Sequence, residues 1–223
     1  MTEPEKIEKG SVRLFTSGTD HTLVPEDGYS RFSYPKLIKL MKFDVRRYRI
    51  NGFGNMMTMR TKGPFGMRLL TMSFMPFEGN SVPYLLTDIM EVGKKRLIFV
   101  EYYDCTSERS EQPLLKRVCE KYSGVPDYEE KPTWYIGERT GYSMIKSLEA
   151  DSKVSLSEIA ADSIRAYKKS AFSAGKSGEN LAGLMKFRER MINEGNPSSD
   201  ILKKVFGEKG AADFFKKCVM PEK

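Results

Sequence analysis

An acidic residue within an apolar strand is the feature of this sequence best suited to chemistry. Asp88 lies in the run Pro83–Val92, where strand alternation places it on one face with Tyr84, Leu86 and Met90. Burial among such side chains raises the pKa of a carboxyl group because it disfavours the charged form. The group then becomes a proton donor near neutral pH. The alternative is an aspartate near a strand end that hydrogen-bonds to a loop, which is the commoner use of such a residue.

Other catalytic and metal-binding residue types are scarce. The sequence has one histidine, His21, and three widely spaced cysteines, Cys105, Cys119 and Cys218. These numbers exclude a disulfide framework, a four-ligand zinc site and a histidine-based catalytic pair, and they indicate a reducing, cytoplasmic location. The segment Gly52-Phe-Gly54 starts like a dinucleotide-binding loop, but the third glycine is missing and no helix follows. Redox or hydrolytic chemistry in this chain would therefore not rest on a nucleotide fold or a metal.

The composition is that of a globular protein with excess positive charge. The 223 residues include 37 Lys+Arg and 30 Asp+Glu, which gives a formal net charge of +7. No window approaches the ~18 uninterrupted apolar residues that a membrane helix needs, so we expect no membrane interaction. The charge is compatible with nucleic acid, an anionic ligand or an acidic protein as partner. Because the sequence lacks aromatic-basic repeats and recognised nucleic-acid-binding modules, we do not expect a nucleic-acid partner.

The elements that must position Asp88 are a sheet followed by helices. Residues 1–30 are predicted to form a loosely held N-terminal arm, residues 31–223 a single domain, and residues 35–42 a short helix. Strands are predicted at Phe43–Ile50, Asn55–Thr61, Met67–Met75, Pro83–Val92, Lys95–Tyr103 and Trp134–Leu148, and helices at Gln112–Lys121, 155–172, 178–193 and 200–219, the last broken at Gly207. Short links between strands imply an antiparallel meander, so the fold class is α+β with helices covering the sheet.

Three blocks of the sequence resemble the ferredoxin-dependent bilin reductases. The C-terminal block runs from Phe187 through Asn196 and Phe206-Gly207-Glu to Val219-Met-Pro221. A central block joins Leu69-Leu-Thr71-Met-Ser-Phe-Met-Pro76 to Val82-Pro83-Tyr-Leu-Leu-Thr-Asp88. The third is Pro132-Thr-Trp134 followed by Tyr142-Ser-Met, which is similar to the family's Pro-x-Trp block. The blocks occur in the family's order and cover about residues 40 to 221.

This resemblance implies a three-layer α/β/α sandwich in which a linear tetrapyrrole such as biliverdin lies between the sheet and the C-terminal helices. It implies that reduced ferredoxin supplies single electrons directly to the bilin and that the protein supplies protons. It also implies that no flavin, nicotinamide or metal is bound, and we expect a monomer. The positive charge agrees with an acidic electron donor. The alternatives are a non-catalytic tetrapyrrole-binding protein and a reductase of a chlorophyll catabolite.

The resemblance also assigns roles to individual residues. Asp88 stands at the position of the family's catalytic aspartate, which favours its interpretation as the proton donor. Thr71 and Met59 stand where the phycocyanobilin-forming branch has a histidine and a glutamate. Because that acid pair is missing here, we expect a two-electron reduction that uses Asp88.

Three further residues are candidates for binding the bilin. Asn196 falls where the family has a second polar residue, often aspartate. An amide can hydrogen-bond a pyrrole or a carbonyl but cannot deliver a proton as a carboxylic acid does, and the alternative is a turn residue before Pro197. Arg47 and Arg49, on a predicted strand, are candidates to pair with the two propionates of a bilin.

Overall fold

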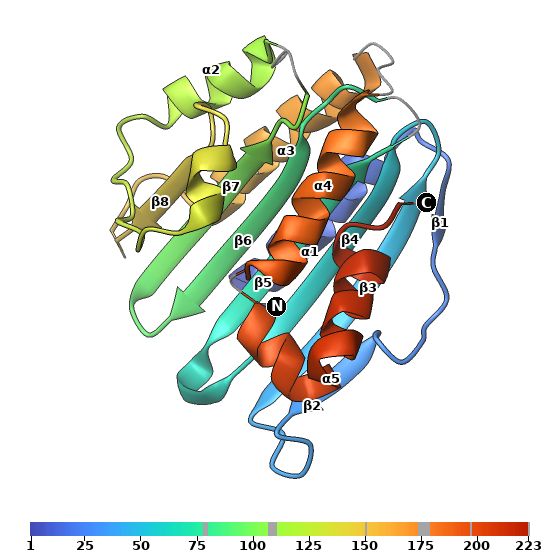
Figure 1. Cartoon of the computed structure of the whole chain (residues 1–223). Helices are drawn as coiled ribbons and strands as arrows, with labels where there is room; N and C mark the ends of the chain where they lie inside the picture. The colour runs from blue at the N-terminus through green and yellow to red at the C-terminus, as the bar shows by residue number, and fades with distance from the viewer. Residues whose placement is uncertain (78–79, 107–110, 150, 174–178, 197, 223) are drawn as a thin grey trace.

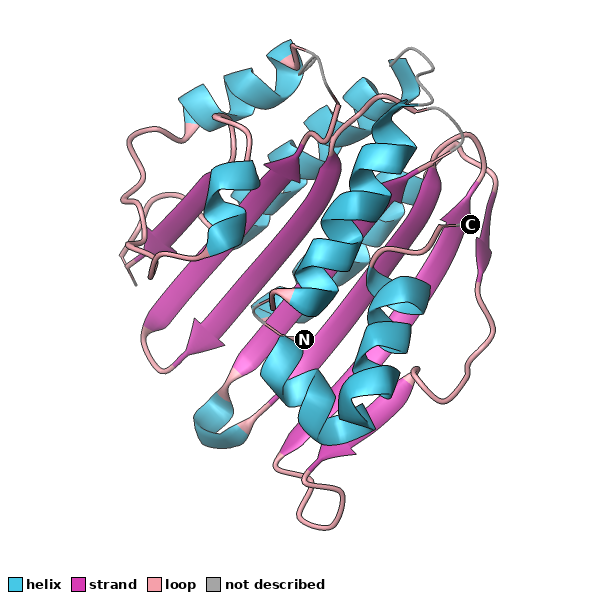
Figure 2. Cartoon of the chain, in the orientation of Figure 1, coloured by secondary structure: helices cyan, strands magenta, loops and turns pink. Residues whose placement is uncertain are grey.

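A large antiparallel sheet forms the middle layer of the molecule (Figures 1 and 2). The computed structural model describes residues 1–77, 80–106, 111–149, 151–173, 179–196 and 198–222. Within these residues the sheet has eight strands in the order β1-β3-β4-β5-β6-β7-β8, with β2 also paired to β3. The strands are β1 (His21–Leu23), β2 (Arg31–Tyr34), β3 (Met41–Ile50), β4 (Gly54–Lys62), β5 (Arg68–Pro76), β6 (Tyr84–Val92), β7 (Lys95–Tyr103) and β8 (Met144–Leu148).

Helices cover both faces of this sheet. They are α1 (Glu3–Thr16), α2 (Pro113–Lys121), α3 (Leu156–Ser173), α4 (Glu179–Asn193) and α5 (Ser199–Phe214), with the short helices η1 (Pro64–Gly66), η2 (Trp134–Glu138) and η3 (Phe215–Val219). One hydrophobic core lies between the sheet and helices α1, α2 and α3, and a second lies between the sheet and helices α4, α5 and η3. The antiparallel α+β fold with three layers is thereby confirmed.

The prediction of a loose arm over residues 1–30 is wrong, because residues 3–16 form helix α1. Thr2 and Glu5 make a reciprocal capping box at its start. Phe15 is fully buried against the rings of Phe53 and Phe74, and Glu8 accepts a hydrogen bond of 2.8 Å from the hydroxyl of Thr58. The polar composition of this segment concealed the helix, since only one side of α1 is apolar and its docking depends on partners elsewhere in the chain.

The helix predicted over residues 35–42 is also absent from this part of the structure. Tyr34 pairs with Met41, so β2 and β3 form a hairpin and residues 35–40 form its turn. Leu37 and Ile38, which the helical interpretation would place on a packed face, are exposed at this turn. Pairing between neighbouring strands therefore prevailed over the local helical spacing of the apolar residues.

Two later predictions were right in part. The strand predicted over Trp134–Leu148 is confirmed only for Met144–Leu148, because Trp134–Glu138 forms the short helix η2. The break at Gly207 is confirmed, since its φ of 73° interrupts helix α5 in a conformation that glycine adopts readily. Gly178, the first residue of the helix predicted over 178–193, lies outside the described residues, and so does Pro197. Within the described ranges, no helix is both long enough and apolar enough to cross a bilayer.

Candidate functional site

Met59, Thr71 and Asp88 form one row across three neighbouring strands. Met59 on β4 is the direct partner of Thr71 on β5, which is the partner of Asp88 on β6. Residues opposite each other in an antiparallel pair point to the same face of the sheet, so all three side chains face helices α4 and α5. The three residues singled out from β4, β5 and β6 are therefore brought together by the sheet register.

This row lines a small internal cavity of about 30 Å³. The helical side contributes Met191 of α4, Asn196 of the following loop, and Leu202 and Phe214 of α5, so the lining is mainly apolar. Thr71 and Asp88 are the polar groups that the sheet presents to it. The cavity has room for about one water molecule, and the Asp88 residue at its wall is only partly exposed.

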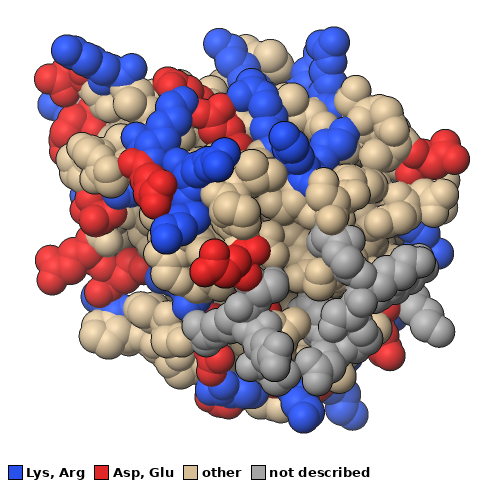
Figure 3. Space-filling view, turned by 90° about the horizontal axis from the view of Figure 1, so that it is seen from above, with Lys and Arg blue, Asp and Glu red and all other residues tan. Residues whose placement is uncertain are grey.

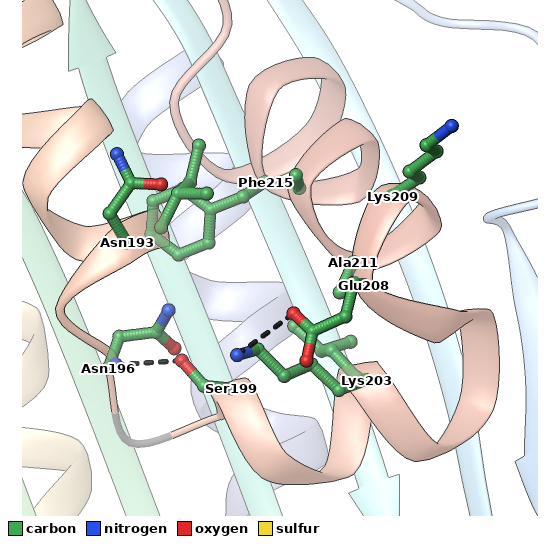
Figure 4. Close-up of a pocket in the computed structure, with 11 residues that line it drawn as sticks. Asn193, Asn196, Ser199, Lys203, Glu208, Lys209, Ala211 and Phe215 are labelled. Atoms are coloured by element: carbon green, nitrogen blue, oxygen red, sulfur yellow. Dashed lines mark hydrogen bonds and ion pairs between the residues drawn. The ribbon is translucent and has the colours of Figure 1, made fainter.

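A larger, open pocket of about 310 Å³ lies outside this cavity, between α4 and α5 (Figure 4). Asn196, Leu202 and Phe215 line both spaces, so they form the partition between them. Figure 4 shows Asn196 beside Ser199 at the start of α5, and Lys203 in an ion pair with Glu208 farther along that helix. The pocket between α4 and α5 is therefore separated from the cavity of Asp88 by the side chains of Asn196, Leu202 and Phe215.

The environment of Asp88 favours the protonated carboxyl group. Burial raises its pKa from 3.8 to about 6, although the hydroxyl of Thr71, which donates to Oδ1 over 2.5 Å, acts in the opposite direction. The burial effect is larger because the apolar cavity wall offers little solvation to a charge. The carboxyl group of Asp88 is therefore protonated in most molecules at mildly acidic pH and in a smaller fraction near neutral pH. This agrees with the expectation from its position in the strand.

A second buried carboxyl group, Glu101 on β7, was missed by the sequence analysis. It lies opposite Leu86 on the same face as Asp88, and burial together with the nearby charge of Asp88 raises its pKa to about 7, against the opposing effect of Arg139. The hydroxyl of Tyr103 donates to Glu101 over 2.8 Å, and the Arg139 guanidinium forms an ion pair with it. The rule that singled out Asp88 also applies here, since alternation places Glu101 among apolar strand residues.

Arg139 is held by a second carboxylate as well as by Glu101. Its Nη2 donates to Glu130 over 3.0 Å. Tyr84 on β6 is the cross-strand partner of Tyr103, and its hydroxyl is buried near Ser73. Burial and the charges of Asp88 and Glu101 raise the pKa of Tyr84. Two acids and two tyrosine hydroxyls therefore lie together on this face of the sheet.

Asn196 lines the cavity and also organises the loop between α4 and α5. Its amide nitrogen donates to the carbonyl of Met191 over 3.0 Å, and its Oδ1 accepts from the backbone nitrogen of Ser198 over 3.0 Å. The backbone nitrogen of Asn196 donates to the Ser199 hydroxyl over 2.7 Å. These bonds give Asn196 the role of a turn residue, which was the alternative to ligand binding. They also hold its side-chain amide between the cavity of Asp88 and the outer pocket.

Arg47 and Arg49 do not reach the cavity that contains Asp88. Both line a separate pocket of about 230 Å³ beside the C-terminal segment, together with Lys216 and Lys217. Arg47 is paired with Asp27 over 2.8 Å. Two strands, β4 and β5, separate β3, which carries both arginines, from the strand of Asp88. At ~4.8 Å per strand this is a spacing of roughly 14 Å, so only an extended ligand could contact both places.

The described residues contain no group of three or more His, Cys, Asp or Glu side chains arranged to hold a metal ion. On the face that carries α2 and the upper ends of the helices, acidic side chains are interspersed among the lysines and arginines (Figure 3). This face therefore does not present one continuous basic patch.

Comparison with known proteins finds the fold but no relative in sequence. No family model matches the chain, and no curated protein matches it. Among solved structures, the tomato phytochromobilin synthase in complex with biliverdin matches with a TM-score of 0.79. The match covers 96% of this chain and 81% of that one at 12% sequence identity. The chain therefore shares its fold with this phytochromobilin synthase.

Proposed function

We propose that this protein reduces an open-chain tetrapyrrole, biliverdin or a related bilin, with electrons from reduced ferredoxin and with Asp88 as a proton donor. The observation that carries the proposal is the carboxyl group of Asp88, which is held by Thr71 in an apolar cavity and has a pKa of about 6. The shared fold with a biliverdin-bound protein supports the choice of substrate class. We further propose that the protein is monomeric and cytoplasmic and holds no resident cofactor.

The proposed reaction needs two electrons and two protons for each double bond reduced. Two ferredoxins each deliver one electron, and the Oδ–H of Asp88 passes one proton to the bilin. A carboxyl group with a pKa of about 6 suits this step, because a usable fraction is protonated near neutral pH. Glu101, with a pKa of about 7, is the candidate source of the second proton, through the tyrosine hydroxyls beside it.

Binding must enlarge the cavity, because a bilin cannot enter a space of about 30 Å³. Ligand sites for molecules of this size are usually ~300–1,000 Å³. The outer pocket between α4 and α5 already has about 310 Å³, and Leu202 and Phe215 separate it from Asp88. We therefore propose that the bilin enters between α4 and α5 and displaces these two side chains, which joins the two spaces.

A bilin carrier without catalysis is the second candidate. It is favoured by Thr71 and Met59, neither of which can supply a proton as a carboxylic acid or an imidazolium would. A reductase of a chlorophyll catabolite would use the same acid on a different tetrapyrrole. The two enzymes and the carrier differ in turnover and substrate rather than in the type of ligand bound.

The test is an anaerobic assay with biliverdin and reduced ferredoxin, followed by visible absorption. We expect a bound-bilin spectrum that bleaches or shifts with time in the wild type. Asp88→Asn should bind biliverdin normally but turn over about 10²–10⁴-fold more slowly, which is the usual contribution of a general acid. Glu91→Gln is the matched control, since it removes a carboxylate from the same strand but the opposite face.

Three outcomes would contradict parts of this proposal. Unchanged turnover in Asp88→Asn would remove the proton-donor role. A bound spectrum that never changes in the wild type would support the carrier. Failure to bind biliverdin, with turnover of a chlorophyll catabolite, would assign the other substrate, and failure to bind any tetrapyrrole would end the proposal.

A further inference from the structure

Three hairpin turns lie along one end of the sheet, beyond the row of Met59, Thr71 and Asp88. They are residues 35–40 between β2 and β3, helix η1 between β4 and β5, and Gly93-Lys94 between β6 and β7 (Figure 1). The strand register places them together, because Lys42 pairs with Lys62 and Arg68 pairs with Glu91. The turn between β2 and β3 projects beyond the helices at the lower end of the molecule (Figure 2).

The first two turns carry large apolar side chains that are more than half exposed. Leu37 and Phe65 are each 96% exposed, Ile38 is 70% exposed and Leu40 is 53% exposed. Single exposed apolar residues are common on protein surfaces, but four at two neighbouring turn tips form a group. Each leaves apolar surface in water that burial elsewhere would stabilise, so the group indicates a contact with something apolar.

Unpaired lysines gather at this end of the sheet. Five lysines at the turns have no ion pair with any described residue: Lys36, Lys39, Lys42, Lys94 and Lys95. Three acidic residues close by are paired, Glu5 with Lys62, Glu91 with Arg68 and Glu3 with Arg96. Glu149, at the end of β8, follows the partner of Arg96 and leaves a negative charge beside the β6–β7 turn. Lys36, Lys39 and Lys42 are therefore the unpaired charges that flank the apolar residues of turn 35–40.

We propose that this end of the sheet docks on an anionic lipid surface, with Leu37, Ile38 and Phe65 entering the interface between headgroups and acyl chains. Exposed apolar side chains with lysines beside them have the chemistry of interfacial anchors, in which hydrophobic insertion and attraction to anionic headgroups act together. A lipid surface suits these tips better than a protein partner, because separate projecting tips need no complementary groove, whereas a stable protein interface needs ~800 Å² of shaped surface on each side.

This proposal departs from the expectation, drawn from composition, that the chain has no membrane interaction. Composition averages over all residues, whereas attachment depends on which apolar side chains stay exposed after folding. The turn residues line neither the cavity of Asp88 nor the pocket between α4 and α5, so the proposal does not depend on the reaction proposed above. A protein that failed to reduce any bilin could still bind vesicles through these turns.

Vesicle flotation tests the proposal with phosphatidylcholine vesicles, with and without phosphatidylglycerol. We expect binding of the wild-type chain only to the anionic vesicles. Lys36→Glu with Lys39→Glu should lower the partition coefficient by at least ~25-fold, since each lysine near an anionic surface is worth about fivefold. Leu37→Ser with Phe65→Ser should lower it by more than ~10-fold through lost insertion.

The matched controls are Leu23→Ser and Lys169→Glu, which change an exposed leucine and an exposed lysine away from the three turns. Both should bind vesicles as the wild type does. A Phe65→Trp variant gives an independent readout, because its emission should shift to shorter wavelength on anionic vesicles and be quenched by brominated lipids.

Several results would overturn the proposal. Equal loss of binding in the controls would show non-specific adsorption by net charge. Unchanged binding in the Leu37→Ser, Phe65→Ser variant would remove insertion. A last contrary case is that the wild type binds no vesicles, while the lysine variant binds an acidic protein such as ferredoxin more weakly than the wild type does. That pair of results would assign this end of the sheet to a protein partner.

Discussion

Asp88 makes the stability of this fold depend on pH in the direction opposite to that of most carboxylates. Its pKa is 3.8 in the absence of burial and about 6 in the folded chain. Between these values the folded state holds a proton that the unfolded state has released. The stabilisation from this proton is complete below about pH 4 and is lost as the pH rises through about 6.

Raising the pKa of Asp88 from 3.8 to about 6 corresponds to about 3 kcal/mol. Because the Asp88 residue is partly exposed, we expect solvent to reduce the measurable effect to about 2 kcal/mol. The substitution Asp88→Asn isolates the contribution of this proton to stability. The amide keeps the size of the side chain and an acceptor for the Thr71 hydroxyl, but it does not titrate.

Urea denaturation, followed by circular dichroism between about pH 4 and pH 8, measures this difference. We expect the free energy of unfolding of Asp88→Asn, relative to wild type, to rise by about 2 kcal/mol over that range. Thr71→Val tests the direction of the effect. The Thr71 hydroxyl lowers the pKa of Asp88, so its removal should shift the loss of stability to higher pH. Glu91→Gln controls for the loss of one negative charge.

A difference between Asp88→Asn and wild type that stays constant or falls as the pH rises would refute this reasoning. It would mean that the folded chain stabilises the carboxylate rather than the acid. The role of Asp88 as a proton donor near neutral pH would then lose its physical basis.

Four other perturbations have definite expected outcomes. Arg139→Met should destabilise the fold by about 3–5 kcal/mol in urea denaturation, because Glu101 keeps a buried carboxyl without its cation, and a second change, Glu101→Gln, should recover part of the loss. Phe15→Ala should cost about 3–5 kcal/mol, and a neutral result would mean that α1 does not dock on the sheet. The kcat/KM for bilin reduction should fall about tenfold per pH unit above about 6, and a flat profile would separate catalysis from Asp88. Calorimetric titration should show ferredoxin binding weaken as salt rises, whereas salt-independent affinity would contradict electrostatic docking.

The sequence was most informative where structure is local. The predicted strand at Lys95–Tyr103 has the same bounds in the structure, and the helix predicted over 155–172 is shifted by one residue at each end. Residues 3–16 were mistaken for a loose arm because their helix is stabilised by contacts with distant parts of the chain. Residues 35–42 were mistaken for a helix because their spacing is helical, while the pairing of β2 with β3 imposes a turn.

The candidate site was foreseeable to the extent that it depends on strand alternation. Alternation placed Asp88 on an apolar face, and the same rule would have found Glu101 on the next strand. Its partner Arg139 lies outside the strand that carries Glu101, so no local pattern could join the two. The separation of Arg47 and Arg49 from the cavity likewise depends on the order of the strands in the sheet.

The sequence by itself determined which residues share a face of each strand, the scarcity of histidine and cysteine, and the excess of positive charge. These follow from backbone geometry and residue type alone. Only the tertiary structure decided that Met59, Thr71 and Asp88 stand in one row, that their cavity is small, and that apolar turn residues remain exposed. Register, cavity size and exposure are set by packing between segments far apart in the chain, and it is this packing that shifts the pKa of Asp88.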